Sequence, residues 1–202
     1  MGGPTMQTQQ LIEQARSGNE LAFSRLVDDW YPRIYNYAYK YFSDHDLAME
    51  AAQKTFIAVH RKLSQLQDAS KFKGWLYRIA TNYCHEEERR NRHRWVLPFF
   101  QTGKEEHDRV REVASQHRQD NPEAQYGHHE LSDVLQLALA ELPEEQREVV
   151  IMKEYEGLKF REIAEALSIS ENTAKSRLYY GLKALRKILI AREIPQESLR
   201  YE

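Results

Sequence analysis

The stretch GLKFREIAEALSISENTAKSRL (residues 157–178) decides how the second half of the chain folds. Ile163 and Leu167 recur at helical spacing and predict a short helix with one buried face. Residues 168–170 interrupt that pattern as a tight turn, and Ser170 or Asn172 can cap a second helix. Two helices joined by so short a turn are typical of a helix-turn-helix unit, whose second helix lies in the major groove of DNA.

The outward side of this second helix carries side chains suited to DNA. Lys175 and Arg177 can neutralise phosphates, and Ser176 can reach a base edge or a backbone oxygen. The positions predicted to contact duplex DNA are Asn172, Thr173, Lys175, Ser176, Arg177, Tyr179 and Tyr180. The alternative is a purely structural helical hairpin without a DNA contact.

Helical spacing of apolar residues extends over most of the remaining chain. Only 8 glycines and 6 prolines occur among 202 residues, which favours helices over a turn-rich β fold. A break is expected at residues 17–19, and Pro32 predicts a kink or a helix restart near Trp30. Further helices are expected over residues 44–63, 71–90, 131–142, 144–156, 160–167 and 171–192.

Residues 95–130 differ from their surroundings. They include two prolines and two glycines among mostly polar neighbours, which indicates a flexible linker with at most a transient helix near residues 109–114. The sequence therefore predicts an all-α protein of two small helical domains. Its predicted segments are a disordered or added start (1–7), a first domain (8–95), the linker (96–130), a second domain (131–192) and a C-terminal tail (193–202).

The net charge depends strongly on which segment is counted. The whole chain sums to −2, which alone argues against a nucleic-acid protein. Residues 71–94 and residues 170–190 each carry +4, whereas residues 131–169 carry −5. Positive charge is thus concentrated on two helices, as local contact with a polyanion requires. The alternative is that these basic residues only complement the dipoles of their helices.

The first basic helix interleaves aromatic side chains with cations in KFKGWLYRIATNY (residues 71–83). Aromatic faces stack on unpaired bases at roughly 1–3 kcal/mol per base, and cations follow the phosphates, so this surface suits single-stranded DNA. The residues predicted to hold such a strand are Lys71, Phe72, Lys73, Tyr77, Arg78, Asn82, Arg89 and Arg90. Trp75, Leu76 and Ile79 are expected to be core. For Phe72, Tyr77, Asn82 and the arginines a structural role stays open.

Several classes of site find no support in the sequence. A single cysteine, Cys84, excludes an internal disulfide framework and a multi-cysteine zinc site. The spacing of Cys84, His85 and His93 fits no usual metal site, and no nucleophile–base pair or glycine-rich phosphate loop occurs. We expect no catalytic residues, no metal and no cofactor. Without a bilayer-spanning apolar run or a signal peptide, a cytoplasmic protein is expected.

Taken together, the two halves resemble a bacterial RNA polymerase sigma factor of the extracytoplasmic-function (ECF) type, in the sigma-70 family. The resemblance covers residues 8–94 and 131–190. Residues 72–82 are similar to the family's promoter-melting segment, and residues 161–177 are similar to its minus-35 reader. It implies a sigma region 2 bundle, a sigma region 4 helix-turn-helix and no enzymatic activity. The implied partners are core RNA polymerase (β′ clamp helices and β flap), promoter DNA and an anti-sigma factor, with the chain at the nucleoid when in holoenzyme.

The resemblance also assigns a contact with polymerase. The segment EAAQKTF (residues 50–56) matches the one that docks on the clamp helices. The implied contact residues are Asp46, Glu50, Gln53 and Phe56. Two positions depart from the family pattern: Ala51 stands where a larger aliphatic residue is common, and Lys54 stands where an acid is common.

Other matched positions bear on DNA. The loop 67–71 corresponds to the place where family members capture a flipped minus-10 base. Ser168 and Asn172 stand where glycines are frequent, and a positive φ would cost serine about 1 kcal/mol. Tyr180 replaces a frequent arginine, which implies a different minus-35 preference. The acidic run 86–88 is expected to point away from DNA or to limit non-specific binding.

The main alternative is a dimeric helix-turn-helix repressor or activator with an N-terminal ligand or dimer domain. It leaves residues 72–94 without a role and predicts a stable dimer on a palindromic site. A helical enzyme or scaffold is a third possibility, and it lacks a convergent site. If the chain is a sigma factor, we expect it to bind promoters weakly on its own, because its acidic segments oppose the two basic helices until polymerase rearranges them.

Overall fold

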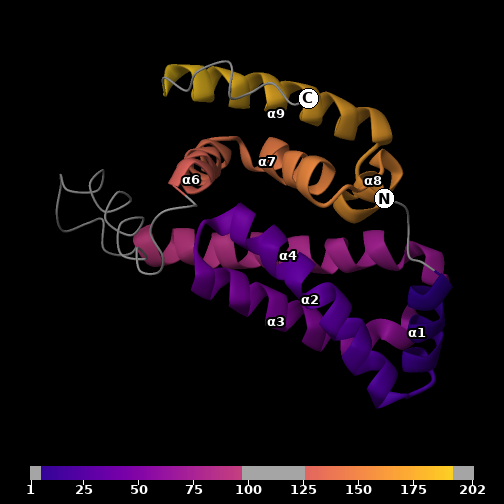
Figure 1. The fold of residues 1–202 in the computed structure, drawn as a ribbon. Coiled ribbons are helices and arrows are strands. Elements are labelled where there is room, and N and C mark those ends of the chain that lie inside the picture. Colours follow the sequence, from indigo (N-terminus) through magenta and orange to yellow (C-terminus); the bar gives the residue numbers. More distant parts are fainter. Residues whose placement is uncertain (1–5, 97–125, 193–202) are drawn as a thin grey trace.

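A computed structural model describes residues 6–96 and 126–192, and every element within these ranges is helical, as the sequence predicts (Figure 1). The first group comprises α1 (Met6–Arg16), α2 (Glu20–Phe42), α3 (His45–Lys62), the short 3₁₀ turns η1 (Leu63–Gln65) and η2 (Ala69–Lys71), and α4 (Phe72–Val96). The second group comprises α6 (Tyr126–Ala140), α7 (Glu144–Val150), the π-helical turn η3 (Ile151–Tyr155), α8 (Phe160–Leu167) and α9 (Glu171–Ala191).

Local sequence signals explain where the first helices begin. The Asn19 side chain accepts a hydrogen bond from the N–H of Ala22 at 3.0 Å, so α2 starts directly after the predicted break. The Asp44 side chain accepts from the N–H of Leu47 at 2.9 Å and starts α3 in the same way. Both caps satisfy amide groups that the first turn of a helix leaves unpaired.

The predicted restart of a helix near Trp30 is wrong. The helix α2 continues through Pro32 from Glu20 to Phe42. Proline removes one backbone hydrogen bond, but Trp30 and Ile34 on either side are buried in the core. Their burial holds the helix together across the gap, because tertiary packing outweighs one missing bond.

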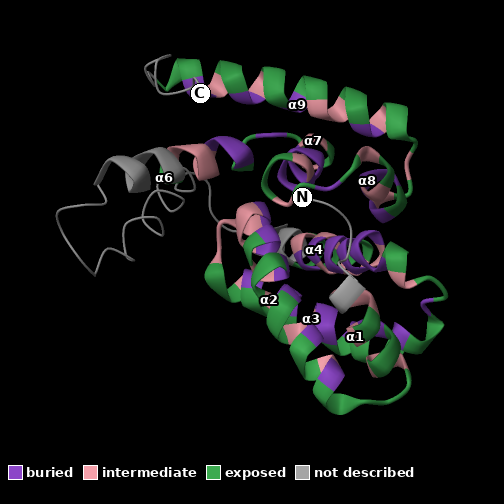
Figure 2. Cartoon of the chain, turned by 45° about the vertical axis from the view of Figure 1, so that its right-hand side comes forward, coloured by how far each residue is buried: buried purple, intermediate pink, exposed green. Residues whose placement is uncertain are grey.

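The two groups of helices pack against each other, which the sequence did not predict. Leu76 and Tyr77 of α4 belong to the same buried core as Met152 of η3, Leu158 of the following loop and Ile163 of α8. In Figure 1, α4 lies between the α2–α3 pair and the α7–α8 segment, and α9 runs along the outside. Figure 2 shows purple, buried residues on both sides of this junction. A smaller core joins α6, α7 and α9.

Parts of the sequence predictions lie outside the described residues. These are the termini (1–5 and 193–202) and most of the linker, including the transient helix near residues 109–114. The helix α6 begins at Tyr126, five positions before the predicted start at residue 131. Within the described ranges, no helix combines the length and the apolar composition that a membrane crossing requires.

Candidate nucleic-acid interface

Helices α8 and α9 form the predicted helix-turn-helix. The N–H of Ile169 bonds to the carbonyl of Ala164 at 3.0 Å and closes α8, and Ser168 takes a left-handed φ of 56°. The Ser170 side chain then accepts from the N–H of Thr173 at 3.0 Å and caps α9. Ser168 is therefore the strained turn residue, whereas Asn172 lies inside α9 and has no positive φ.

Replacing Ser168 by glycine should stabilise the chain by about 1 kcal/mol, because only glycine takes the left-handed region without steric cost. The control is Ser176→Gly in the second turn of α9, which should destabilise by about 1 kcal/mol, since glycine weakens a helix interior. Urea unfolding of the three proteins measures both changes. If the urea midpoint of Ser168→Gly lies at or below the wild-type value, the backbone at Ser168 is not strained.

The outer face of α9 carries a mixed polar and aromatic surface. Tyr179 and Tyr180 are 63% and 57% exposed, and their ring centroids lie 5.4 Å apart at an edge-to-face angle. The other exposed residues that were predicted to read DNA are Asn172, Lys175 and Ser176. Five of the seven predicted duplex-contacting residues are thus available on one helix.

The two remaining predicted residues are partly exposed and have partners within the chain. The Thr173 hydroxyl lies 2.8 Å from the Ser170 hydroxyl, as part of the cap. Arg177 forms ion pairs with Glu145 at 2.8 Å and with Glu148 at 3.6 Å, both on α7. Arg177 therefore ties α9 to α7 in this structure through its two acidic partners.

The predicted single-strand surface on α4 is divided between an exposed side and a covered side. Lys71, Arg78 and Asn82 are exposed, as are Arg89 and Arg90 farther along the helix. Phe72 is fully buried, with its ring centroid 5.4 Å from that of Trp30, so it serves the core. Of the expected core residues, Leu76 is buried and Trp75 and Ile79 are partly buried.

Lys73 and Tyr77 lie on the covered side, beneath the second group of helices. The Lys73 ammonium donates to the carbonyls of Glu156 at 3.0 Å and Gly157 at 3.4 Å. The Tyr77 hydroxyl donates to the Glu156 carboxylate at 2.6 Å. Burial lowers the pKa of Lys73 and raises the pKa of Tyr77, because each charged form is removed from water.

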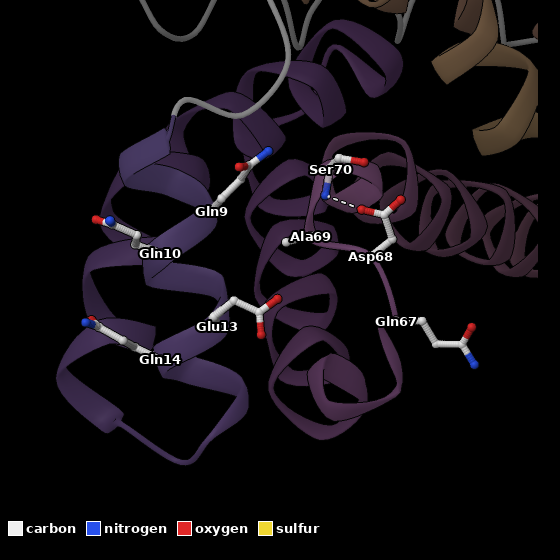
Figure 3. A pocket seen from close by; sticks show the side chains of 8 residues that line it. All are labelled: Gln9, Gln10, Glu13, Gln14, Gln67, Asp68, Ala69 and Ser70. Carbon is white, nitrogen blue, oxygen red and sulfur yellow. Dashed lines mark hydrogen bonds between the residues drawn. The ribbon is translucent and has the colours of Figure 1, made fainter.

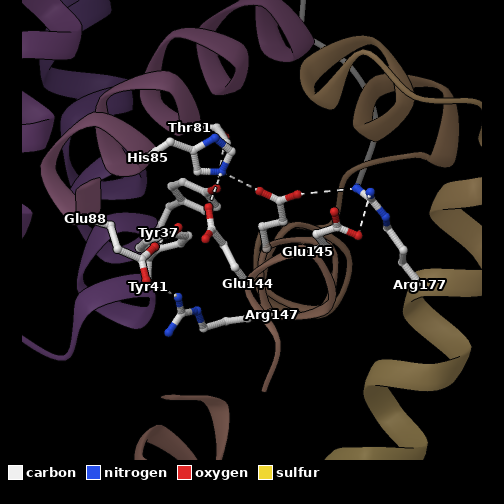
Figure 4. A network of polar contacts seen from close by, with 10 residues as sticks. Tyr37, Tyr41, Thr81, His85, Glu88, Glu144, Glu145, Arg147 and Arg177 are labelled. Carbon is white, nitrogen blue, oxygen red and sulfur yellow. Dashed lines mark hydrogen bonds and ion pairs between the residues drawn. The ribbon is translucent and has the colours of Figure 1, made fainter. Parts of the chain in front are cut away.

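A polar network joins the two groups of helices farther along α4 (Figure 4). The Arg147 guanidinium lies 4.5 Å from the ring centroid of Tyr41 and 3.4 Å from the Glu88 carboxylate, which also accepts from the Tyr41 hydroxyl at 2.5 Å. His85 lies 2.8 Å from Glu148 and 3.4 Å from Glu144. Glu148 thus faces both His85 of α4 and Arg177 of α9.

His85 should make the association of the two groups of helices pH-dependent. Its hydrogen bond to Glu148 raises its pKa above the ordinary 6.5. A raised histidine pKa contributes stability that is complete below the unfolded-state pKa and disappears as the pH rises through the folded-state value. We expect His85→Ala to lower the melting temperature clearly at pH 6 and little at pH 9.

The control is His60→Ala, at an exposed histidine 3.7 Å from Glu20 on the first group of helices alone. Thermal unfolding at several pH values measures both variants. An effect of His85→Ala that is as large at pH 9 as at pH 6 would exclude the charged contact as its cause. In the parts of the chain that the structure describes, neither His85 with its two glutamates nor any other group of His, Cys, Asp or Glu is arranged so that it could hold a metal ion.

The acidic run 86–88, which was expected to point away from DNA or to limit non-specific binding, mostly contacts other parts of the chain. Glu87 is buried and pairs with Lys54 of α3 and with Arg90 at 2.8 Å. Glu88 takes part in the Arg147 network, and only Glu86 is exposed. Lys54, the basic departure from the family pattern, therefore has two acidic partners, since it also pairs with Glu50 at 2.7 Å.

The predicted polymerase contact on α3 is mostly accessible. Asp46, Glu50 and Gln53 are exposed, whereas Phe56 is 7% exposed and packs in the core. The same helix exposes Met49 and Ile57, which sequence reasoning missed. Exposed apolar residues that recur at helical spacing would have been the signal.

An open hollow of about 750 Å³ lies between α1 and the loop before α4 (Figure 3). The loop contributes residues 67–70, where the Asp68 carboxylate accepts from the N–H of Ser70 at 2.8 Å. The helix α1 contributes Gln9, Gln10 and Gln14, together with Glu13. The loop was singled out from the sequence, but the glutamines were not, because only the folded chain brings them to the loop.

Each of the two groups of helices matches a known family model. The family model described as Sigma-70 region 2 matches residues 26–94. The family model described as Sigma-70, region 4 matches residues 132–185. The first range contains the α3 and α4 surfaces, and the second contains the helix-turn-helix.

Individual relatives agree with these matches. The ECF RNA polymerase sigma factor SigW of Bacillus subtilis is 30% identical over 184 residues, which cover 91% of this chain and 97% of that protein. The ECF RNA polymerase sigma factor SigE of Mycolicibacterium smegmatis is 35% identical over 170 residues, 83% of this chain and 62% of that protein.

Solved structures show the same fold. CnrH in complex with the cytosolic domain of CnrY has a TM-score of 0.67 at 22% identity, covering 92% of this chain and 98% of that one. The sigma factor RpoE from Bartonella quintana, in complex with the anti-sigma factor NepR, has a TM-score of 0.63 at 25% identity. That match covers 83% of this chain and 96% of RpoE.

Proposed function

Because the chain is a member of the sigma-70 family, of the ECF type, we propose that it binds core RNA polymerase and directs transcription from promoters that it selects itself. The observation that carries this proposal is the exposed face of α9, which displays Asn172, Lys175, Ser176, Tyr179 and Tyr180 at the outside of a helix-turn-helix. This face reads the minus-35 element in the major groove. The dimeric repressor explains only the second half and leaves the match to region 2 without a role.

Melting of the minus-10 element is the task of α4 and the adjoining hollow. Each opened base-pair step costs about 1.4 kcal/mol. Stacking returns roughly 1–3 kcal/mol per base, so two or three captured bases offset part of that cost. The amide groups of Gln9, Gln10 and Gln14 offer donors and acceptors to a base that enters the hollow beside the loop.

The α3 surface around Asp46, Glu50 and Gln53 serves as the contact with the β′ clamp helices, extended by the exposed Met49 and Ile57. Region 4 contacts the β flap. An anti-sigma factor is a further partner, since the chain has the fold of a sigma factor that was solved in complex with one. We place the chain in the cytoplasm, where polymerase and DNA are found, as a specificity subunit without catalysis of its own.

Reconstitution with core RNA polymerase tests this function. Purified protein, core enzyme and genomic DNA fragments are mixed, and transcripts are mapped against a reaction with core enzyme alone. We expect new start sites that share two promoter elements, and co-elution of the protein with core enzyme. If no new transcripts appear and the protein does not co-elute with core enzyme, the proposal is contradicted.

A further inference from the structure

Lys73 and Tyr77 are one helical turn apart on the same face of α4, and both are engaged by a single turn of the second half. The Lys73 ammonium holds two carbonyls of residues 156–157, and the Tyr77 hydroxyl holds the Glu156 carboxylate. Lys73 is 4% exposed and Tyr77 is fully buried. The turn continues from η3, and Gly157 adopts a φ of 61° that lets the chain reverse there.

The chemistry of this contact is that of a nucleic-acid contact. A lysine ammonium and an aromatic ring in succession are what a single strand needs for its phosphate and its base. The turn offers the lysine two carbonyl oxygens and offers the tyrosine an anionic carboxylate, so oxygen acceptors stand where phosphate oxygens would bind.

We propose that the turn at Glu156–Gly157 is an internal competitor of single-stranded DNA, which occupies Lys73 and Tyr77 until the two groups of helices separate. The inference rests on the proposed function and states how binding of the melted strand is regulated. DNA capture on the covered side of α4 and association of the two groups are mutually exclusive. The outer face of α9 stays exposed in the closed form, so closure blocks melting but leaves minus-35 recognition open.

Polar contacts that water can replace join the two groups of helices beside the apolar core that they share through Leu76, Met152 and Ile163. Besides the Glu156 turn these polar contacts include the His85–Glu148 pair and the Lys40 ammonium, 4.8 Å from the Tyr155 ring centroid. Gln136 of α6 also donates to the carbonyls at the end of α2, at 3.0 Å. Water replaces each of these hydrogen bonds at a small net cost, so the shared apolar core is the main barrier to opening, which binding to polymerase has to offset.

The matched pair Glu156→Ala and Glu154→Ala tests the proposal. Both remove one negative charge from the same segment, but Glu154 is exposed, whereas Glu156 holds Tyr77. Binding of a fluorescein-labelled random-sequence single strand of about 16 nucleotides is measured by anisotropy. Closure is measured by energy transfer between dyes at Ser64→Cys and Lys187→Cys, two exposed positions, because the native Cys84 is buried.

We expect Glu156→Ala to lower energy transfer and to tighten strand binding roughly tenfold, since an unpaired buried hydroxyl disfavours the closed form. Glu154→Ala should stay within about twofold of wild type, the effect of one exposed charge. Tyr77→Phe deletes the same bond from the α4 side and should repeat the result. Circular dichroism confirms that each variant is folded.

Equal tightening by Glu154→Ala and Glu156→Ala would overturn the proposal, because charge alone would then explain it. Unchanged binding in both Glu156→Ala and Tyr77→Phe would overturn it as well. Transcription by the wild-type chain with core polymerase distinguishes a failure of the proposed competition from a failure of the proposed function. If transcripts appear and strand binding is unchanged in these variants, only the competition is wrong; if no transcripts appear, the function itself fails.

Discussion

Replacing Gly74 by leucine should separate the two groups of helices without unfolding either. The nearest neighbours of a Cβ at Gly74 would lie on α8, with the Glu162 carbonyl and the Glu165 carboxylate at 3.4 Å. Leucine extends well beyond a Cβ and must displace α8, and overpacking of this kind costs about 1–3 kcal/mol. Within α4 itself, leucine is a better helix former than glycine by about 1 kcal/mol, so the first group should not lose stability.

Gly74→Ala is the matched control, because its Cβ fits at ordinary van der Waals distance. We expect the alanine variant to keep the energy transfer of wild type, and the leucine variant to lose most of it and to bind single strands more tightly. Small-angle scattering should show a larger radius of gyration for leucine alone. If the leucine variant stays as compact as wild type, the contact between α4 and α8 does not keep the chain closed.

Asn172→Ala should weaken promoter-directed transcription roughly 5- to 150-fold. Asn172 is exposed in the first turn of α9, where an amide can form two hydrogen bonds with adenine, and such a pair is worth about 1–3 kcal/mol. On a template whose contacted base pair has been changed, the variant and the wild-type chain should give equal yields, since Asn172 of the wild-type chain then also lacks its base. Transcript yield on both templates measures this dependence.

Lys187→Ala is the control, since Lys187 is exposed on the last turns of the same helix, away from its N-terminus. Its effect should be small and equal on both templates, as for a residue without a base contact. Transcription by Asn172→Ala at wild-type yield would contradict base reading by the first turn of α9.

The local parts of the fold could be predicted because short-range signals agree. The apolar spacing of Ile163 and Leu167, the turn and the Ser170 cap all lie within one stretch, and α8 and α9 have nearly the predicted bounds. Asn19 and Asp44 fix two more helix starts by hydrogen bonds within three residues. Such contacts depend on neighbours that the sequence displays directly.

The covered side of α4 could not be predicted for the opposite reason. The partners of Lys73 lie more than 80 positions away, and no periodicity in α4 indicates that a distant turn will cover it. Lys73 and Arg78 look equally suitable for DNA in sequence, yet one is buried and the other exposed. Arg177 shows the same limit, because its acidic partners on α7 decide where its charge is used.

The most direct test of the account follows energy transfer and transcription in the same sample. The chain labelled at Ser64→Cys and Lys187→Cys is combined with core polymerase and a mapped promoter. We expect energy transfer to fall when the holoenzyme forms and to stay low while transcripts accumulate. Transcripts from a holoenzyme whose labelled chain keeps the full energy transfer of the free protein would show that the closed form is itself active, and would contradict it.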